Sequence, residues 1–289
     1  MGDAERVQFE AGFDRISELD RALVELRALV KRAYESTPLF TARVMQIRRS
    51  PAYEKAFEAD PLVTVRIGTH RSPEELFDRA LPSVIAQTYP RWEAIVVCDG
   101  QEPDTVRRVA KLGEARVRCL ERPRNGPYPT DPLARWRVVG AHPFNDAVAH
   151  ASGSWIAPID DDDEWTDDHL EVLLGRAQAT RAELVYGVLR AFVADLGETW
   201  FGAWPPELGD FGFQAAIYHA GLSDFAYDAN AYLVGEPADW NVARRMLEAG
   251  VRFDFVDQVV GNYYLQASYH SIGWWTDRLH SRGAFNPPN

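Results

Sequence analysis

An apolar run that ends in four consecutive aspartates is the feature that most constrains the fold of this chain. The run at 155–159 (Trp-Ile-Ala-Pro-Ile) predicts a buried β-strand, and the aspartates at 160–163 follow it directly. The segment 166–168 (Thr-Asp-Asp) then has the composition of a helix start. Open α/β sheets are built from strands that lead through turns into helices, and they bind ligands where the strands end. We therefore expect residues 160–163 to lie at the ligand-binding edge of an α/β sheet.

The four adjacent carboxylates also predict a bound cation. They repel one another, and folding alone gives no reason to accept that repulsion. A divalent cation would cancel the repulsion and could clamp a diphosphate. The alternative is a solvated acidic loop, the usual form of an acidic run, but the position directly after a strand favours the cation. A calcium-binding loop is excluded, because Trp165 stands where the sharp turn of that loop needs glycine.

Composition limits the partners and the compartment. The net charge of -12 over 289 residues argues against binding along a nucleic-acid backbone. No apolar stretch approaches the ~20 residues of a membrane-spanning helix, and the charged N-terminus lacks the core of a signal peptide. We therefore expect a soluble cytoplasmic protein without an integral membrane segment. Cys98 and Cys119 lie in strand-like apolar runs, so we expect buried thiols rather than a disulfide.

Residues 1–60 predict a helical extension that is separate from the rest of the chain. The segments 36–38 (Ser-Thr-Pro) and 50–51 (Ser-Pro) interrupt the helical pattern, so a long helix should be followed by a shorter one near 39–47. Apolar residues recur along the long helix at alternating intervals of three and four: Ile16, Leu19, Leu23, Leu26, Val30 and Ala33. We expect this stripe to pack on the helix at 39–47; pairing with another chain, as a homo-oligomer, is the alternative.

Strand and helix patterns alternate from residue 63 onward. Strands are expected at 63–67, 94–98, 116–120 and 155–159, with helices between them at 73–87, 103–112 and 145–151. Beyond the acidic run we expect a helix at 167–179, a strand or hairpin at 184–193, a helix at 239–249 and a strand at 253–260. The alternation predicts a mostly parallel sheet with helices on its faces.

Several motifs, taken in their order along the chain, resemble those of family 2 glycosyltransferases of the GT-A fold. They are 63–71 (VTVRIGTHR), 80–90 (ALPSVIAQTYP), 96–100 (VVCDG), 153–165 (GSWIAPIDDDDEW), 238–241 (ADWN) and 252–257 (RFDFVD). The resemblance extends over about 62–271 and leaves the N-terminal helices outside it. No single motif decides the matter, whereas their order over that length is specific.

The resemblance implies an α/β, Rossmann-like GT-A fold: a mostly parallel sheet with flanking helices, preceded by the helical extension at 1–60. Residues 61–289 would form the catalytic domain, with a nucleotide-sugar-binding half at 61–165 and an acceptor-binding half at 166–289. The implied enzyme is an inverting, hexosyltransferase-type glycosyltransferase that moves a sugar from a nucleotide-sugar to an acceptor hydroxyl, in polysaccharide or glycoconjugate biosynthesis. UDP is the expected carrier, with dTDP and GDP left open, and Mn²⁺ or Mg²⁺ is the expected cofactor.

Matching the motifs residue by residue also implies the donor site. Thr69 and Asp99 would contact the base and ribose of the nucleotide. Asp160 and Asp161 would bind the donor, with Asp161 close to the ribose or the metal, and Asp162 would bind the metal ion. A carboxylate suits position 99 because it can accept the N3 hydrogen of a uracil-like base. The alternative for Asp99 is a turn residue ahead of a glycine.

The general base and a second metal ligand are implied in the same way. Asp239 would take the proton of the acceptor hydroxyl, since a single in-line displacement needs one base opposite the diphosphate. Its alternative is an N-cap for a helix that begins at Trp240. His270 is carried as a metal ligand, with a solvent-exposed histidine as the alternative.

Three residues depart from the family pattern. Cys98 stands where an aspartate is frequent, Phe144 where an arginine often precedes the asparagine, and Ala238 where a glutamate is common. Phe144 removes an expected contact to the donor phosphates. Three nearby basic residues are candidates to replace it: Arg124, Arg135 and Arg137. Aromatic residues between the metal and base motifs would either stack on an acceptor sugar or pack in the core. They are Trp200, Phe201, Trp204, Phe211 and Phe213.

Two other functions compete with glycosyl transfer. A sugar nucleotidyltransferase would also use acidic metal ligands on a nucleotide-binding fold. It should carry a glycine-rich phosphate loop with Lys or Arg after the first strand, and 68–71 (Gly-Thr-His-Arg) matches such a loop poorly. A non-catalytic partner of the same fold, which binds nucleotide-sugar weakly, is favoured only by the three departures.

Overall fold

A mixed nine-stranded sheet runs through the residues that the computed structural model describes, which are 3–71, 74–193 and 197–265. Its strands lie in the order β3-β2-β1-β4-β8-β6-β9-β5, and β7 pairs with β6 outside this path. The strands are β1 (Val63–Thr69), β2 (Trp92–Cys98), β3 (Val117–Glu121), β4 (Trp155–Asp160), β5 (Glu164–Trp165), β6 (Leu184–Val193), β7 (Gly197–Phe201), β8 (Ala216–His219) and β9 (Phe253–Leu265).

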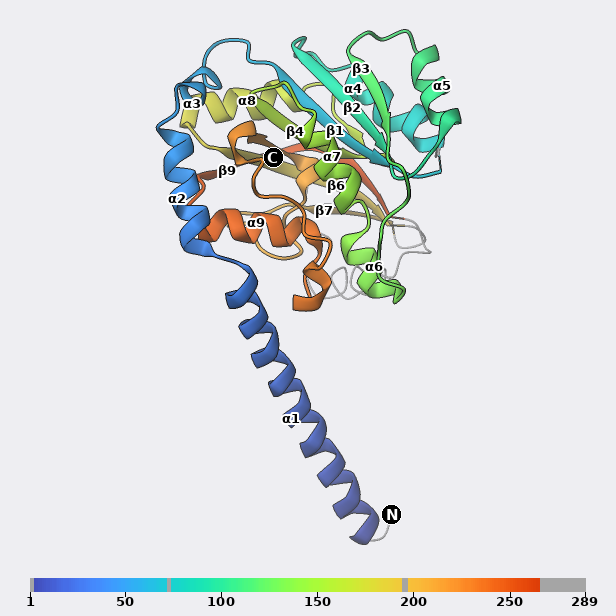
Figure 1. Ribbon diagram of the computed structural model, residues 1–289, viewed down its shortest axis with the longest axis vertical. Helices are drawn as coiled ribbons and strands as arrows, with labels where there is room; N and C mark the ends of the chain where they lie inside the picture. Colours follow the sequence, from blue (N-terminus) through green and yellow to red (C-terminus); the bar gives the residue numbers. More distant parts are fainter. Residues whose placement is uncertain (1–2, 72–73, 194–196, 266–289) are drawn as a thin grey trace.

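Helices cover both faces of the sheet, and one of them leaves the body as a rod (Figure 1). The α-helices are α1 (Asp3–Tyr34), α2 (Thr37–Arg48), α3 (Pro51–Lys55), α4 (Leu81–Ile85), α5 (Pro103–Lys111), α6 (Pro132–Val138), α7 (Ala141–Ala149), α8 (His169–Thr180) and α9 (Ala238–Glu248). A π-helical turn, η1 (Leu76–Ala80), runs into α4, and three short 3₁₀ helices are η2 (Phe213–Ala215), η3 (Ala220–Leu222) and η4 (Ala231–Val234). The sequence analysis did not predict α6.

The first half of the sheet has the predicted parallel order. β1 pairs in parallel with β2 and with β4, and β2 pairs in parallel with β3. The register sets Thr69 beside Cys98 and Gly68 beside Asp160. Every residue of β1 is buried, as expected for a strand with helices on both faces. The carboxyl ends of β1, β2 and β4 therefore meet at one edge of the sheet.

The second half of the sheet mixes directions. β8 runs antiparallel to both β4 and β6, which joins the two halves into one sheet. The hairpin expected in the region of 184–193 forms between β6 and β7, and β9 returns parallel to β6. β5, the short strand just after the acidic run, pairs antiparallel with β9. Residues 160–163 are thus held between the central strands and the C-terminal strand. Cys98 and Cys119 are free thiols on neighbouring strands, as expected; Cys98 is buried and Cys119 is partly exposed.

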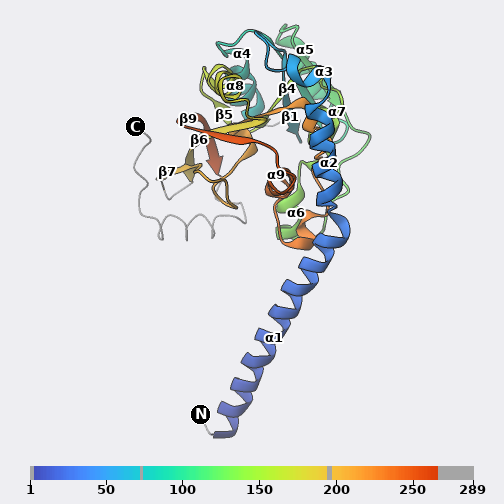
Figure 2. The same cartoon turned by 90° about the vertical axis from the view of Figure 1, so that its left-hand side faces the viewer.

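The helical extension docks on the body through α2 and α3, and α1 adds contacts to η4 at its C-terminal end. Glu183, which is 1% exposed, accepts hydrogen bonds from Arg48 at 2.6 and 2.7 Å and from the Tyr53 hydroxyl at 2.9 Å. The backbone N–H of Arg252 completes the set at 2.9 Å. The expected packing of the α1 stripe on α2 was wrong. Both views show α1 projecting from the body as a single rod (Figures 1 and 2), and Leu19 on its stripe is 63% exposed.

Candidate functional site

One large cavity opens at the edge where β1, β2 and β4 end. Its volume is about 640 Å³, within the range of small-molecule sites. Six of the seven residues that the sequence analysis assigned to the site line it: Thr69, Asp99, Asp160, Asp161, Asp162 and Asp239. The seventh, His270, lies outside the described residues. The first five lie at or just after the carboxyl ends of the parallel strands, and Asp239 comes from α9.

The acidic turn carries concentrated, partly buried charge. Burial and the neighbouring Asp162 raise the pKa of Asp161 to about 8, while contacts with Thr69 and with the backbone of His70 act in the opposite direction. Burial also raises the pKa of Asp160, and Arg66 opposes that rise. Ionising all three carboxylates therefore costs free energy unless positive charge enters the cavity.

Asp163, the last aspartate of the run, has a structural role and does not line the cavity. It is 1% exposed, and its Oδ1 accepts a hydrogen bond from the backbone N–H of Tyr264 at 3.1 Å. Burial and the nearby Asp162 raise its pKa well above the usual range. Asp163 therefore ties the turn to β9, and only the first three aspartates face the cavity.

Asp99 is held firmly at the end of β2. Its carboxylate accepts hydrogen bonds from Arg122 Nη1 at 2.5 Å, from Asn125 Nδ2 at 3.1 Å and from the backbone N–H of Gly126 at 3.3 Å. The Tyr128 hydroxyl donates a further hydrogen bond. The segment after β3 thus folds back over Asp99 and fixes the direction of its carboxylate at the cavity wall.

Asp239 lies in the first turn of α9 and is not its N-cap. The helix begins at Ala238 with Pro237 at the N-cap, so the N-cap interpretation of Asp239 was wrong by two positions. The Oδ1 atom of Asp239 accepts a hydrogen bond from the Trp240 N–H at 2.6 Å. Burial raises the pKa of Asp239 to about 6; the Trp240 N–H and Arg66 lower it, and Asp160 raises it further. A carboxylate tuned in this way is suited to accept a proton near neutral pH.

Arg66 is a cavity residue that the sequence analysis missed. It lies on β1 and is 2% exposed, with its guanidinium carbon 3.6 Å from the centroid of the Phe144 ring and 5.0 Å from that of Tyr227. Its Nη2 donates to the Tyr227 hydroxyl at 2.6 Å, and its Nη1 is 3.5 Å from Asp160 Oδ1. Among the described residues, neither Nε nor Nη1 has a hydrogen-bond partner. Arg66 therefore brings a buried positive charge with unused donors to the cavity wall.

Two glycines make room for the ring that supports Arg66. A Cβ atom on Gly68 or on Gly140 would come within 2.6 Å of the Phe144 ring. Gly140 also has a φ of 87°, which favours glycine. Of the three arginines proposed to replace an arginine at position 144, only Arg137 lines the cavity among the described residues. The sequence did carry one signal for Arg66, which is a charged residue inside the apolar run of β1. Its role could not be predicted from that signal, because the partners of Arg66 come from distant segments.

The aromatic residues divide between the cavity and the rest of the fold. Phe201, Phe211 and Phe213 line the cavity, whereas Trp200 and Trp204 do not. Trp204 is 55% exposed. The lining also includes aromatic residues that were not predicted: Trp136, Tyr227, Trp240 and Tyr263. The cavity lining thus combines acidic and aromatic side chains.

The acidic turn fits a cation that is shared with a ligand better than one enclosed by protein. Within the described part of the chain, no three His, Cys, Asp or Glu side chains converge on one point. Mg²⁺ in phosphate-binding sites is held by one or two carboxylates together with the phosphates of the substrate. Asp161 and Asp162 supply oxygen donors of that kind at the cavity wall.

Solved structures define the fold class as GT-A. S. aureus TarS 1–349 superposes with a TM-score of 0.53 at 16% identity, covering 70% of this chain and 60% of TarS. Mannosyltransferase PcManGT from Pyrobaculum calidifontis superposes with a TM-score of 0.55 at 17% identity, covering 92% of this chain and 77% of that one. At such low identity the likeness establishes the fold alone, and it confirms the predicted α/β architecture.

The sequence family is likewise established. The profile of Glycosyl transferase family 2 matches residues 64–129 and 139–232, so the chain belongs to that family. In Escherichia coli, the glucosyltransferase WfgD is 30% identical over 129 residues, 44% of this chain and 46% of WfgD. The putative colanic acid biosynthesis glycosyl transferase WcaA from Escherichia coli K12 is 31% identical over 122 residues, 41% of this chain and 39% of WcaA. The matched region thus spans less than half the length of either relative.

Among the described residues, no helix is both long enough and apolar enough to cross a membrane.

Proposed function

We propose that this chain transfers a sugar from a nucleoside-diphosphate sugar to an acceptor hydroxyl, with inversion, in a metal-assisted single displacement. The observation that carries the proposal is the cavity that an acidic turn and Asp239, whose pKa is about 6, line from two elements. Membership of family 2 supports it. So do the printed names of relatives: WfgD is a UDP-Glc-dependent β-1,3-glucosyltransferase, and PcManGT was solved with GDP-Man and Mn²⁺.

The donor would occupy the wall made by the parallel strands. Thr69 and Asp99 contact the base and ribose, and Asp160 and Asp161 approach the sugar and ribose hydroxyls. Asp162 would hold Mn²⁺ or Mg²⁺, which would supply positive charge next to the leaving nucleoside diphosphate. UDP is the expected carrier because TarS was solved with UDP and with UDP-GlcNAc, while the GDP-Man complex of PcManGT keeps GDP open.

Arg66 would supply the protein's own positive charge to the leaving group. Its Nε and Nη1 are buried without hydrogen-bond partners among the described residues. Nη1 is ion-paired with Asp160 at 3.5 Å, whereas Nε can bind a phosphate oxygen without first breaking an internal bond. The stacked Phe144 ring keeps the guanidinium in place. Arg66 then takes the role that an arginine at position 144 would have had.

Asp239 would act as the general base. Its carboxylate accepts the proton of the acceptor hydroxyl as that oxygen bonds to the anomeric carbon and the bond to the diphosphate breaks on the opposite face. The aromatic part of the lining, which includes Phe211, Phe213 and Trp240, would bind the acceptor sugar. We assign the acceptor to polysaccharide or glycoconjugate biosynthesis, as the colanic acid name of WcaA suggests. A cytoplasmic location, the division at residues 60 and 165, and metal binding by His270 remain predictions.

A donor panel with product analysis tests the proposal. The protein is incubated with Mn²⁺, one nucleotide-sugar at a time and a set of glycan acceptors, and nucleoside diphosphate release is measured. We expect release with one donor, and an NMR spectrum of the product in which the anomeric configuration is inverted. Pyrophosphate released from a nucleoside triphosphate and a sugar 1-phosphate would instead identify a nucleotidyltransferase. Donor binding with neither transfer nor hydrolysis would identify a non-catalytic protein.

A further inference from the structure

The apolar stripe of α1 is exposed where the helix leaves the body. The helix has 32 residues and is therefore about 48 Å long. On the stripe, Ile16 is 58% exposed, Leu19 63%, Leu23 43% and Leu26 56%. Figures 1 and 2 show that the helix stands clear of the sheet and of its covering helices from two directions. A row of large apolar side chains in water indicates a missing partner.

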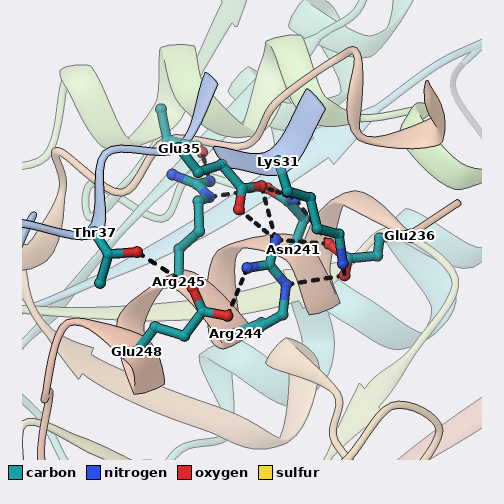
Figure 3. A network of polar contacts seen from close by, with 9 residues as sticks. Lys31, Glu35, Thr37, Glu236, Asn241, Arg244, Arg245 and Glu248 are labelled. Atoms are coloured by element: carbon teal, nitrogen blue, oxygen red, sulfur yellow. Dashed lines mark hydrogen bonds and ion pairs between the residues drawn. The ribbon is translucent and has the colours of Figure 1, made fainter. Parts of the chain in front are cut away.

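The contacts that α1 makes with the body use a different face (Figure 3). Lys31 pairs with Glu236 at 2.5 Å, and Glu35 pairs with Arg244 at 2.7 Å. The guanidinium of Arg27 lies beside Gly235. Arg27 and Lys31 lie on α1 and Glu35 directly follows its last residue, and because the three recur every four positions they share one face. Because they anchor the C-terminal end of α1 to η4 and α9, the direction in which α1 leaves the body is fixed, and the stripe from Ile16 to Leu26 is left uncovered.

The pattern of the stripe matches a second copy of the same helix. Read as heptads, Ile16, Leu23 and Val30 occupy the a positions, and Leu19, Leu26 and Ala33 occupy the d positions. Two of the three a residues are β-branched and two of the three d residues are leucine, the combination that favours a parallel, two-stranded coiled coil. We propose that α1 pairs with α1 of a second copy of this chain in that arrangement. The two stripes are then identical surfaces related by a two-fold axis.

The charges that flank the stripe are complementary in the same arrangement. Arg15 falls at a g position and Asp20 at the following e position. In a parallel pair these two positions on opposite helices lie side by side, so Arg15 of each copy meets Asp20 of the other.

Two substitutions on neighbouring residues test the pairing. Leu23 lies on the stripe, whereas Val24 is just as apolar, is 64% exposed and lies off it. We expect light scattering of the full chain to give a dimer mass that falls toward the monomer on dilution. Leu23→Glu should raise the protein concentration at which half of the dimer has dissociated by about tenfold or more. Val24→Glu should leave that concentration unchanged. Circular dichroism checks that both variants stay folded.

Cysteine crosslinking tests the direction of the pair. In a parallel, in-register dimer the two Leu23 positions face each other, so Leu23→Cys should form a disulfide-linked dimer under mild oxidation. Val24→Cys should not, and the unmodified chain controls for Cys98 and Cys119. A wild-type chain that is monomeric at every concentration would overturn the proposal, as would equal loss of the dimer in both Glu variants. A dimer that Leu23→Cys fails to crosslink would overturn the parallel arrangement. None of these readouts depends on enzymatic activity.

Discussion

At the scale of single residues, the site is a balance of buried charges around one arginine. Arg66 lies 3.5 Å from Asp160 and also lowers the pKa of Asp239, while Asp160 and Asp239 raise each other's cost of ionisation. Burial raises the pKa of both carboxyls, and Arg66 limits that rise. The guanidinium of Arg66 on β1 therefore favours the ionised forms of both Asp160 and Asp239, the proposed base.

Asp239→Asn should abolish turnover while leaving the fold intact. The amide oxygen of asparagine can still accept the hydrogen bond from Trp240, and Asp239 is not the helix N-cap, so the loss of stability should stay well below about 1 kcal/mol. Turnover should fall by about 100-fold or more, as expected for loss of a general base, with donor affinity unchanged. Asp104→Asn is the matched control, because Asp104 is an exposed acid in the first turn of α5. Turnover that survives in Asp239→Asn would assign the base elsewhere.

The rate should also depend on pH through Asp239. The base acts only when ionised, and its pKa is about 6, set by burial, by Asp160 and in the opposite sense by Arg66. Arg66 also donates a hydrogen bond to the Tyr227 hydroxyl, and Tyr227 is a further titratable group close to Asp239. We expect kcat/KM to be constant above pH 7 and to fall about tenfold per pH unit below about pH 5. A profile that stays flat down to about pH 4 would contradict the assignment.

Arg66 should contribute to the affinity for the donor diphosphate and not to recognition of the nucleobase. Loss of its bonds to phosphate should cost about 1.5–3 kcal/mol, or roughly 10- to 150-fold in affinity. Arg66→Met should therefore weaken binding of UDP by that factor and leave binding of uridine unchanged, while Arg66→Lys retains part of the difference. Isothermal titration measures both ligands, and melting curves identify any variant that has lost its fold. An equal loss for uridine and UDP would mean that Arg66 supports the cavity wall and does not bind the phosphates.

At the scale of elements, a buried carboxylate joins the helical extension to the sheet. Glu183 at the start of β6 gathers Arg48 from α2, Tyr53 from α3 and the backbone of Arg252 before β9. Burial would raise its pKa, but these hydrogen bonds outweigh burial and lower it. The stabilisation is therefore present above the ordinary pKa of a glutamate and is lost as pH falls through the lowered value.

Glu183→Gln should destabilise the protein by about 2 kcal/mol, because the guanidinium groups of Arg48 and Arg252, 2.6 and 3.5 Å from Glu183, lose a shared buried counterion. This corresponds to a drop of roughly 4–8 °C in melting temperature. Glu54→Gln is the control, since Glu54 forms an exposed pair with Arg181 and should change stability by about 0.5 kcal/mol or less. Thermal unfolding of the three proteins gives the comparison. Equal melting temperatures for all three would show that α2 and α3 are held by apolar packing alone.

Local signals predicted the elements of the first half well, and long-range packing limited the rest. The apolar runs of β1, β2 and β4 and the carboxylates at their ends follow from spacing along the chain, so the acidic part of the cavity lining was predictable. α6 was missed, because its segment 132–138 is short and follows a loop rich in turn residues. The role of Arg66 was missed for another reason: its support comes from Phe144 and Tyr227, which only the folded chain brings together.

At the scale of the whole molecule, one sheet brings together residues from both ends of the sequence. β8 joins the parallel strands to the C-terminal strands, and α9 then places Asp239 in the same cavity as residues 160–162. Arg244 of the same helix pairs with Glu35 at the end of α1, and Glu236, just before α9, pairs with Lys31 of α1. The C-terminal end of α1, the helix proposed to dimerise, therefore lies next to α9, which carries the proposed base. The rest of α1 projects from the body with the apolar stripe exposed.

The central claim is that the acidic turn binds a cation that in turn holds the donor diphosphate. Calorimetric titration of the donor nucleotide-sugar, with and without Mn²⁺, tests it on the wild type and on two isosteric variants. Asp162→Asn removes the proposed ligand, and Asp163→Asn alters the adjacent carboxylate that points to β9 instead. We predict that Mn²⁺ strengthens donor binding at least about tenfold in the wild type and in Asp163→Asn, and not in Asp162→Asn. Donor binding that ignores Mn²⁺ in the wild type, or that is unchanged in Asp162→Asn, would contradict the account.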